Sequence, residues 1–182
     1  NERVLDPSCG DGALLRRAAR WRSWLAAGDS IQAAALYGIE LDATAASVAA
    51  TVPGAVVERA NFLSLDARAY DPFDVVIGNP PYTRAEWIDR LDTAAGQLSL
   101  FVDDAPGDEP AAPASFLPRE LHDSLSGRAG LYAYFLIHSL GFLREGGRLG
   151  FVVPNGWLDV AYGAGLKRFL LAHFRVVAVP ES

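Results

Sequence analysis

The chain has 182 residues, of which 51% are hydrophobic and 21% charged; this suits one globular domain with a buried core and excludes a disordered or fibrous protein. Its formal net charge of -6 predicts that this segment alone binds a polyanion poorly. No run of eighteen apolar residues occurs, so we expect a soluble, cytoplasmic protein without a membrane span. The single cysteine, Cys9, has no partner for a disulfide or a metal site, which excludes redox and zinc chemistry.

Strand and helix patterns alternate from the first residues, which predicts an α/β fold whose mostly parallel sheet carries helices on both faces. The first half should contain strands at residues 3–6, 31–40, 55–59 and 73–78 and helices at residues 11–27 and 43–50. Regular alternation then fails over an insertion at about residues 83–130, where an acidic, Pro-rich stretch predicts a mobile loop. After it we expect a helix at 131–144, a Gly146-Gly147 turn, a strand at 148–154, a helix at 158–173 and a strand at 175–179.

The first chemical motif is the run V-L-D-P-S-C-G-D-G at residues 4–12, in which a strand leads into a glycine-containing turn and then a helix. Glycines at such a turn let the backbone approach a ligand closely, although a tight turn without a ligand would also need them. Glu40 ends the second expected strand, at the edge where an open parallel sheet binds ligands and where an acid can hold ribose hydroxyls. A solvated acid at a strand end is the alternative for Glu40 taken alone.

The most specific motif is Asn79-Pro80-Pro81-Tyr82, which follows the buried run V-V-I-G at the same edge of the sheet. An aromatic amine is a poor nucleophile, because its lone pair is delocalised into the ring. Acceptors on its two protons, such as the Asn79 side-chain oxygen and the Pro80 carbonyl, would favour the form with a localised lone pair. Tyr82 offers a ring face that can stack on a flipped base. The alternative is a proline-stiffened strand end with an interfacial tyrosine.

These motifs, D-P-S-C-G-D-G, G-I-E-L-D, A-N-F-L and N-P-P-Y in this order, resemble the gamma-class methyltransferases that act on N6 of adenine in DNA. The later run R-E-G-G-R-L-G-F-V-V-P-N-G-W-L is similar to the methylase modules of fused type IIG restriction-modification enzymes and of related phage-defence enzymes. The resemblance implies a Rossmann-like class I fold, S-adenosyl-L-methionine as cofactor and double-stranded DNA with a flipped adenine as substrate. A fused or associated nuclease and a specificity domain are further partners that it implies.

The resemblance also assigns residues of this chain to a site. Asn79, Pro80 and Tyr82 would hold the target base and are the expected catalytic residues. The expected cofactor-binding residues are Asp6, Pro7, Gly10, Gly12, Glu40, Leu41, Asn61, Phe62 and Asn79. Asn61 stands where the family commonly has Asp, and its side-chain oxygen can still accept a hydrogen bond from the cofactor's adenine amino group.

Three aromatic residues are weaker candidates for substrate contact, namely Tyr132, Phe135 and Tyr162, whereas Trp157 is expected in the core. The chain begins at Asn1 and contains no methionine, which indicates a piece of a longer polypeptide. The resemblance implies that this piece lacks a cofactor-covering segment before the first strand and a target-recognition domain after the last. It also implies that the sheet, ordered 3-2-1-4-5-7-6 in the family, is incomplete here. Residues 1–182 are thus expected to be one partial catalytic domain, truncated at both ends, and the missing segments would hold the DNA.

Two other functions remain compatible with the motifs. N-P-P-Y also serves planar amides and RNA adenines, so a protein glutamine or RNA methyltransferase is the alternative enzyme. A catalytically idle DNA-specificity scaffold is the alternative from another class, and the intact run from Asn79 to Tyr82 argues against it.

Overall fold

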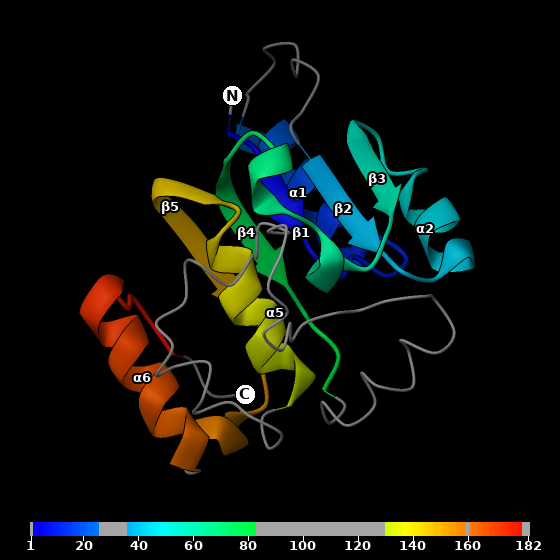
Figure 1. The fold of residues 1–182 in the computed structure, drawn as a ribbon. Helices are drawn as coiled ribbons and strands as arrows, with labels where there is room; N and C mark the ends of the chain where they lie inside the picture. The colour runs from blue at the N-terminus through cyan, green and yellow to red at the C-terminus, as the bar shows by residue number, and fades with distance from the viewer. Residues whose placement is uncertain (1, 26–35, 83–129, 159–160, 180–182) are drawn as a thin grey trace, which may run out of the picture.

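A computed structural model of the chain describes residues 2–25, 36–82, 130–158 and 161–179. Five parallel strands form one sheet in the order β3-β2-β1-β4-β5 (Figure 1). The strands are β1 (Val4–Asp6), β2 (Leu36–Glu40), β3 (Ala55–Arg59), β4 (Phe73–Gly78) and β5 (Leu143–Phe151). The expected α/β fold is confirmed, and so is the order of its first five strands.

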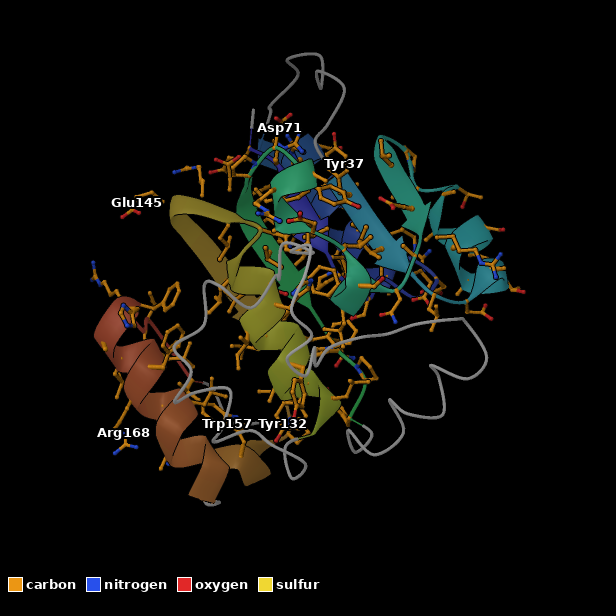
Figure 2. The ribbon with its side chains drawn as sticks, in the orientation of Figure 1. Tyr37, Asp71, Tyr132, Glu145, Trp157 and Arg168 are labelled. Carbon is orange, nitrogen blue, oxygen red and sulfur yellow. The ribbon has the colours of Figure 1, made fainter. Side chains whose placement is uncertain are left out.

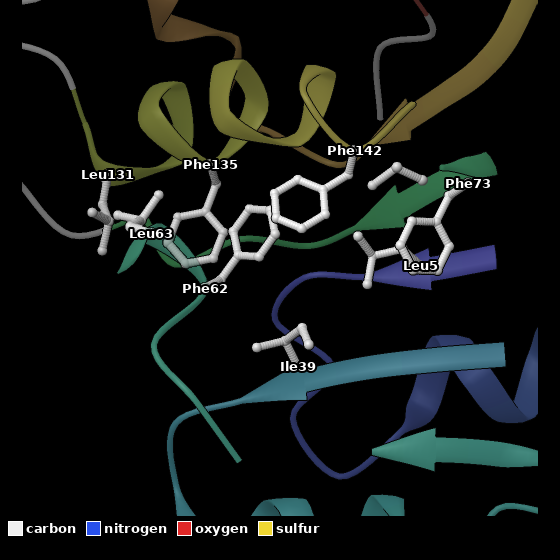
Figure 3. Packing of buried hydrophobic residues seen from close by; sticks show 9 residues of the cluster. Leu5, Ile39, Phe62, Leu63, Phe73, Leu131, Phe135 and Phe142 are labelled. Carbon is white, nitrogen blue, oxygen red and sulfur yellow. The ribbon is translucent and has the colours of Figure 1, made fainter. Parts of the chain in front are cut away.

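Helices cover both faces of the sheet, because successive strand residues point to opposite sides. On β1, Val4 packs in one cluster with Leu15 of α1 (Ala13–Leu25) and Ala49 of α2 (Ala43–Ala49). Its neighbour Leu5 joins the opposite cluster, beneath α5 (Leu131–Leu140). This second cluster is aromatic, and Figure 3 shows three of its rings, those of Phe62, Phe135 and Phe142, close together between α5 and the sheet.

Helix α5 is apolar on nearly all sides, which fits its place between the sheet and α6 (Ala161–His173). One side of α5 contacts the aromatic cluster over the sheet, and the other side packs Tyr132 with Trp157 and Leu166. Figure 2 shows Tyr132 and Trp157 side by side. Trp157 is 9% exposed, as expected for a core residue. It lies in the short 3-10 helix η5 (Asn155–Leu158) that precedes α6.

Within the described ranges, three short 3-10 helices were not expected from the sequence: η5, η1 (Phe62–Ser64) and η2 (Ala67–Ala69). Asn61 caps η1, and Asp66 caps η2, because each side-chain oxygen accepts a hydrogen bond from the backbone N–H two residues ahead. Such short turns carry no strong hydrophobic period, so the sequence pattern cannot reveal them. η1 and η2 fill the connection between β3 and β4, and η1 brings Phe62 into the core.

The second half of the sequence prediction needs two corrections. The helix expected at residues 131–144 ends at Leu140, and the strand expected at 148–154 starts at Leu143. The predicted Gly146-Gly147 turn lies inside β5, where the pairing with β4 shifts register between Phe73 and Val75 and Gly146 adopts a φ of 69°. A glycine pair that signals a turn between elements can equally mark a bulge within one strand.

The second correction concerns residues 175–179, which form no strand. Val177 is 87% exposed, and within the described part of the chain no strand lies beside this segment to bond its backbone. Residues 83–129 of the insertion expected at about 83–130, and the first half of the strand expected at 31–40, lie outside the described residues. No helix in the described ranges is long and apolar enough to span a membrane.

Candidate active site at the carboxyl edge of the sheet

The turn after β1 joins a buried carboxylate to two glycines with positive φ. Asp6 is 1% exposed, and its Oδ1 accepts a hydrogen bond from the backbone N–H of Ser8 at 3.2 Å. Gly10 has a φ of 54°, and a Cβ built there would meet nothing within 4 Å. Gly12 has a φ of 89°, and a Cβ there would touch Val52 and Ala49 at 3.0 to 3.2 Å. Gly12 therefore permits close helix packing, whereas Gly10 leaves open space beside the backbone.

Glu40 connects this turn to the end of β2. Its Oε2 accepts from the Gly10 N–H at 2.8 Å, and its Oε1 accepts from the Asp42 N–H at 2.8 Å. Each carboxylate oxygen retains a further lone pair, so the group can still accept hydrogen bonds from a ligand's hydroxyls. Two other expected cofactor residues flank the two acids, and of these Pro7 is fully buried and Leu41 is 44% exposed.

The protonation of the buried acid follows from its surroundings. Burial raises the pKa of Asp6 from 3.8 to about 7, the Ser8 N–H opposes this shift, and the charge of Glu40 adds to it. A positively charged group placed beside Asp6 would reverse the shift. Burial likewise raises the pKa of the Cys9 thiol to about 12, which keeps this cysteine unreactive at neutral pH.

The A-N-F-L run lies on η1, directly after β3. The Asn61 Oδ1 accepts from the Leu63 N–H at 3.2 Å, and the Ala60 N–H donates to the Glu40 carbonyl at 3.1 Å. The structure therefore ties this run to the end of β2. Phe62 is 2% exposed and packs in the core cluster, so its expected contact with an adenine ring stays a prediction.

The N-P-P-Y motif leaves the end of β4 at the same edge as Asp6 and Glu40, since β4 and β2 both pair in parallel with β1. Asn79 is exposed, Pro80 is fully buried and Tyr82 is 50% exposed. The Tyr82 hydroxyl donates to the Asn79 Oδ1 and lies 3.4 Å from the carbonyl oxygen of Val152. The backbone is thus anchored by a buried proline, while the two polar side chains remain on the surface.

The three weaker candidates for substrate contact lie on α5 and α6. Tyr132 and Phe135 are 6% and 8% exposed and pack in the two clusters on either side of α5. Tyr162 lies in α6, and its side chain is outside the described residues. Substrate contact by these aromatic residues stays a prediction.

Two further residues of the site have no assigned role in the sequence motifs. The Ser8 Oγ is buried and has no hydrogen-bond partner among the described residues, although it follows Asp6 and Pro7 in the first motif. The Val152 carbonyl faces the Tyr82 hydroxyl from the end of β5. Position in a motif could have singled out Ser8, whereas only tertiary structure brings Val152 to Tyr82.

The chain is similar in sequence to known methyltransferases. The Type II methyltransferase M.BanIII of Aneurinibacillus aneurinilyticus is 28% identical over 98% of this chain and 29% of its own length. The Type II methyltransferase M.TthHB8I of Thermus thermophilus is 30% identical over 92% of this chain and 33% of its own length. The chain thus spans about a third of the length of these relatives.

A solved structure from Listeria monocytogenes, assigned to the class I S-adenosylmethionine-dependent methyltransferases, matches the fold with a TM-score of 0.62. The match covers 94% of this chain and 45% of that one at 18% identity, and supports the class I fold expected from the sequence. Residues 54–179 match the family of Eco57I restriction-modification methylases, including the N-P-P-Y motif and β5. The chain therefore belongs to the Eco57I restriction-modification methylase family.

Proposed function

We propose that this chain is the cofactor-binding and catalytic part of a DNA methyltransferase that methylates N6 of adenine, with S-adenosylmethionine as the methyl donor. The observation that carries the proposal is the Asn79-Pro80-Pro81-Tyr82 run, which follows β4 at the edge where Glu40 ends β2. Membership of a restriction-modification methylase family supports DNA as the substrate and methyl transfer as the reaction.

The residues at the ends of β1 and β2 fit the cofactor. S-adenosylmethionine supplies a methyl group on a positively charged sulfonium and carries an ammonium group, a carboxylate, a ribose diol and an adenine. The Asp6 carboxylate can face the positive charge, and Glu40 has lone pairs left for the two ribose hydroxyls. The Ser8 Oγ, for which the described part of the chain provides no partner, offers one more hydrogen bond. Gly10 leaves room for the ligand beside the turn.

The N-P-P-Y motif fits the target amine. In this proposal the Asn79 Oδ1 and the Pro80 carbonyl would accept hydrogen bonds from the two N–H groups of the adenine amine, which would leave its lone pair localised. The sulfonium would supply the methyl group and leave as the neutral thioether S-adenosylhomocysteine, and the methylated amine would release its surplus proton to solvent. The buried Pro80 ring fixes the backbone in advance, so little reorganisation is needed when the base arrives. The half-exposed Tyr82 ring can stack on the flipped base, and stacking of this kind contributes about 1 to 3 kcal/mol.

The proposal is tested by incubating the full-length protein with methyl-labelled S-adenosylmethionine and, separately, with DNA, RNA and a protein mixture. We expect label in DNA only, and N6-methyladenine as the labelled nucleoside after digestion. Label at the cytosine amino group would support a DNA methyltransferase but reject the specificity for adenine. Label in RNA or in glutamine side chains would favour the alternative enzyme. If DNA, RNA and protein all stayed unlabelled, the idle scaffold would be favoured.

A further inference from the structure

A histidine on α5, outside every motif discussed so far, contacts the turn that carries the expected adenine-side residues. The His138 Nε2 lies 3.1 Å from the carbonyl oxygen of Leu65, the residue that ends η1. A carbonyl oxygen can only accept, so the Nε2 must carry the proton in this contact. The imidazole therefore donates a hydrogen bond from α5 to the end of η1.

The ring of His138 also packs against the core beneath η1. It meets the Phe62 ring edge-on at a centroid distance of 4.8 Å and the Phe142 ring at 5.3 Å. Burial lowers the pKa of His138 below its ordinary value, although the carbonyls of Leu65 and Phe62 and the charge of Asp66 oppose the shift. The imidazole is thus neutral at the pH of most cells, which suits a side chain placed among phenylalanines.

η1 needs such support because it is a single short turn. Its internal backbone bonds run from the Ser64 and Leu65 N–H groups to Asn61 and Phe62, at 3.0 and 3.1 Å. One end of the segment is tied to β2, through the bond from the Ala60 N–H to the Glu40 carbonyl. The other end is tied to α5 through His138. A three-residue 3-10 helix is weak by itself, so these two tertiary bonds help to set where Asn61 stands.

We propose that His138 is a positioning residue of the cofactor site, which acts by holding η1 so that Asn61 and the adjoining backbone meet the adenosine part of S-adenosylmethionine. This inference rests on the proposed function, because it names a further determinant of the same site. His138 itself touches neither the cofactor nor the target base. Its loss should weaken cofactor binding and leave the transfer step at saturating cofactor unchanged.

The test compares two variants of His138. His138→Leu fills the space among the phenylalanines with an apolar side chain and removes the donor, whereas the amide nitrogen of His138→Gln can donate from nearly the same place. His173→Leu is the matched control, since His173 is exposed at the end of α6. The dissociation constants of S-adenosylmethionine and S-adenosylhomocysteine are measured by calorimetry on the full-length protein. We expect both constants to rise about three- to tenfold in His138→Leu, the range of a typical lost hydrogen bond, and to recover in His138→Gln.

Two further measurements separate positioning from a general loss of stability. Single-turnover methylation at saturating cofactor should give the same rate in wild type, His138→Leu and His138→Gln. Hydrogen exchange of the cofactor-free proteins should speed up at the Ser64 and Leu65 amides in His138→Leu, while amides of β1 and β4 stay protected. Equal acceleration in the core strands would overturn the positioning role in favour of global destabilisation.

The outcomes distinguish this inference from the proposed function. A wild-type protein that binds no S-adenosylmethionine would reject the proposed function itself. Normal binding by wild type together with unchanged constants in His138→Leu would reject only the role of His138. Equal losses in His138→Leu and His138→Gln, with the control unaffected, would show that the donated hydrogen bond is not what matters.

Discussion

At the ends of β1 and β2 the acidic groups are already bonded to the backbone, whereas at the end of β4 the polar side chains are exposed and bonded chiefly to each other. The Glu40 carboxylate accepts from the amides of Gly10 and Asp42, and Asp6 is 1% exposed. By contrast, Tyr82 is half exposed, and its hydroxyl donates to the Asn79 side chain. The first region is set by the fold before any ligand binds.

This difference has a consequence for the order of events at the site. Little has to move at Glu40 when hydroxyls arrive, because the carboxylate is held in place and has lone pairs to spare. The Asn79 Oδ1 already accepts from the Tyr82 hydroxyl through one of its two lone pairs, and both side chains are exposed, so they can reorient when a substrate amine arrives. We therefore expect variants of the first region to change cofactor affinity and variants of the second to change steps that involve DNA.

The largest effect should come from Asn79→Ala. Loss of one preorganised acceptor for the target amine is expected to slow single-turnover methylation about a hundredfold to a thousandfold, by analogy with a lost oxyanion-hole donor. The dissociation constant of S-adenosylmethionine should stay close to that of wild type. Asn155→Ala is the control, since Asn155 is exposed and lies in η5. A near-normal rate in Asn79→Ala would reduce N-P-P-Y to a structural turn.

The next largest effect should come from Glu40→Ala. Removing a charge-assisted acceptor of the ribose hydroxyls should weaken S-adenosylmethionine binding by about 1.5 to 3 kcal/mol. It also leaves the Gly10 and Asp42 amides without their acceptor. Calorimetry without DNA is the measurement, and Glu58→Ala on β3 is the control, because Glu58 is an exposed acid outside the site. Unchanged affinity in Glu40→Ala would place the cofactor elsewhere.

Tyr82 variants should have a smaller and more graded effect. Tyr82→Ala removes the stacking face and should weaken the productive DNA complex by about 1 to 3 kcal/mol. Tyr82→Phe and Tyr82→Trp should restore most of the single-turnover activity, since a ring face suffices. Tyr82→Phe also removes the hydroxyl that bonds to Asn79. If Tyr82→Phe were as slow as Tyr82→Ala, the hydroxyl rather than the ring would be the functional group.

The smallest effect, taken over one pH unit, concerns the stability of the cofactor-free protein. Because the pKa of Asp6 is about 7 in the folded chain and 3.8 ordinarily, the folded state holds this proton more tightly. The stability that this bound proton contributes is fully present below pH 3.8 and is lost as the pH rises to 7. Between pH 5 and pH 6 the free energy of unfolding should fall by on the order of 1 kcal/mol. Urea unfolding of Asp6→Asn should lack this decline, whereas Asp71→Asn, at an exposed site, should keep it. If the free energy of unfolding fell equally with rising pH in wild type and in Asp6→Asn, the raised pKa of Asp6 would be contradicted.

Local patterns predicted the first half of the fold well because its elements are short and sharply bounded. The strands at residues 55–59 and 73–78 were predicted with the observed ends, and the helix at 43–50 differs by one residue. Prediction was poorer after residue 130, where α5 is apolar on nearly all sides and a glycine bulge interrupts β5. Neither a buried helix nor a bulged strand carries the period on which sequence prediction depends.

The sequence by itself determined the fold class, the family resemblance and the residues at the strand ends, because the motifs directly follow the strands of a parallel sheet. Tertiary structure alone decided how those residues are held. It bonded Glu40 to the turn after β1, buried Asp6 and so raised its pKa, and brought His138 to the end of η1. These contacts join residues about 30 to 70 positions apart. No local pattern encodes such pairs, since their partners meet only when the sheet and α5 have packed.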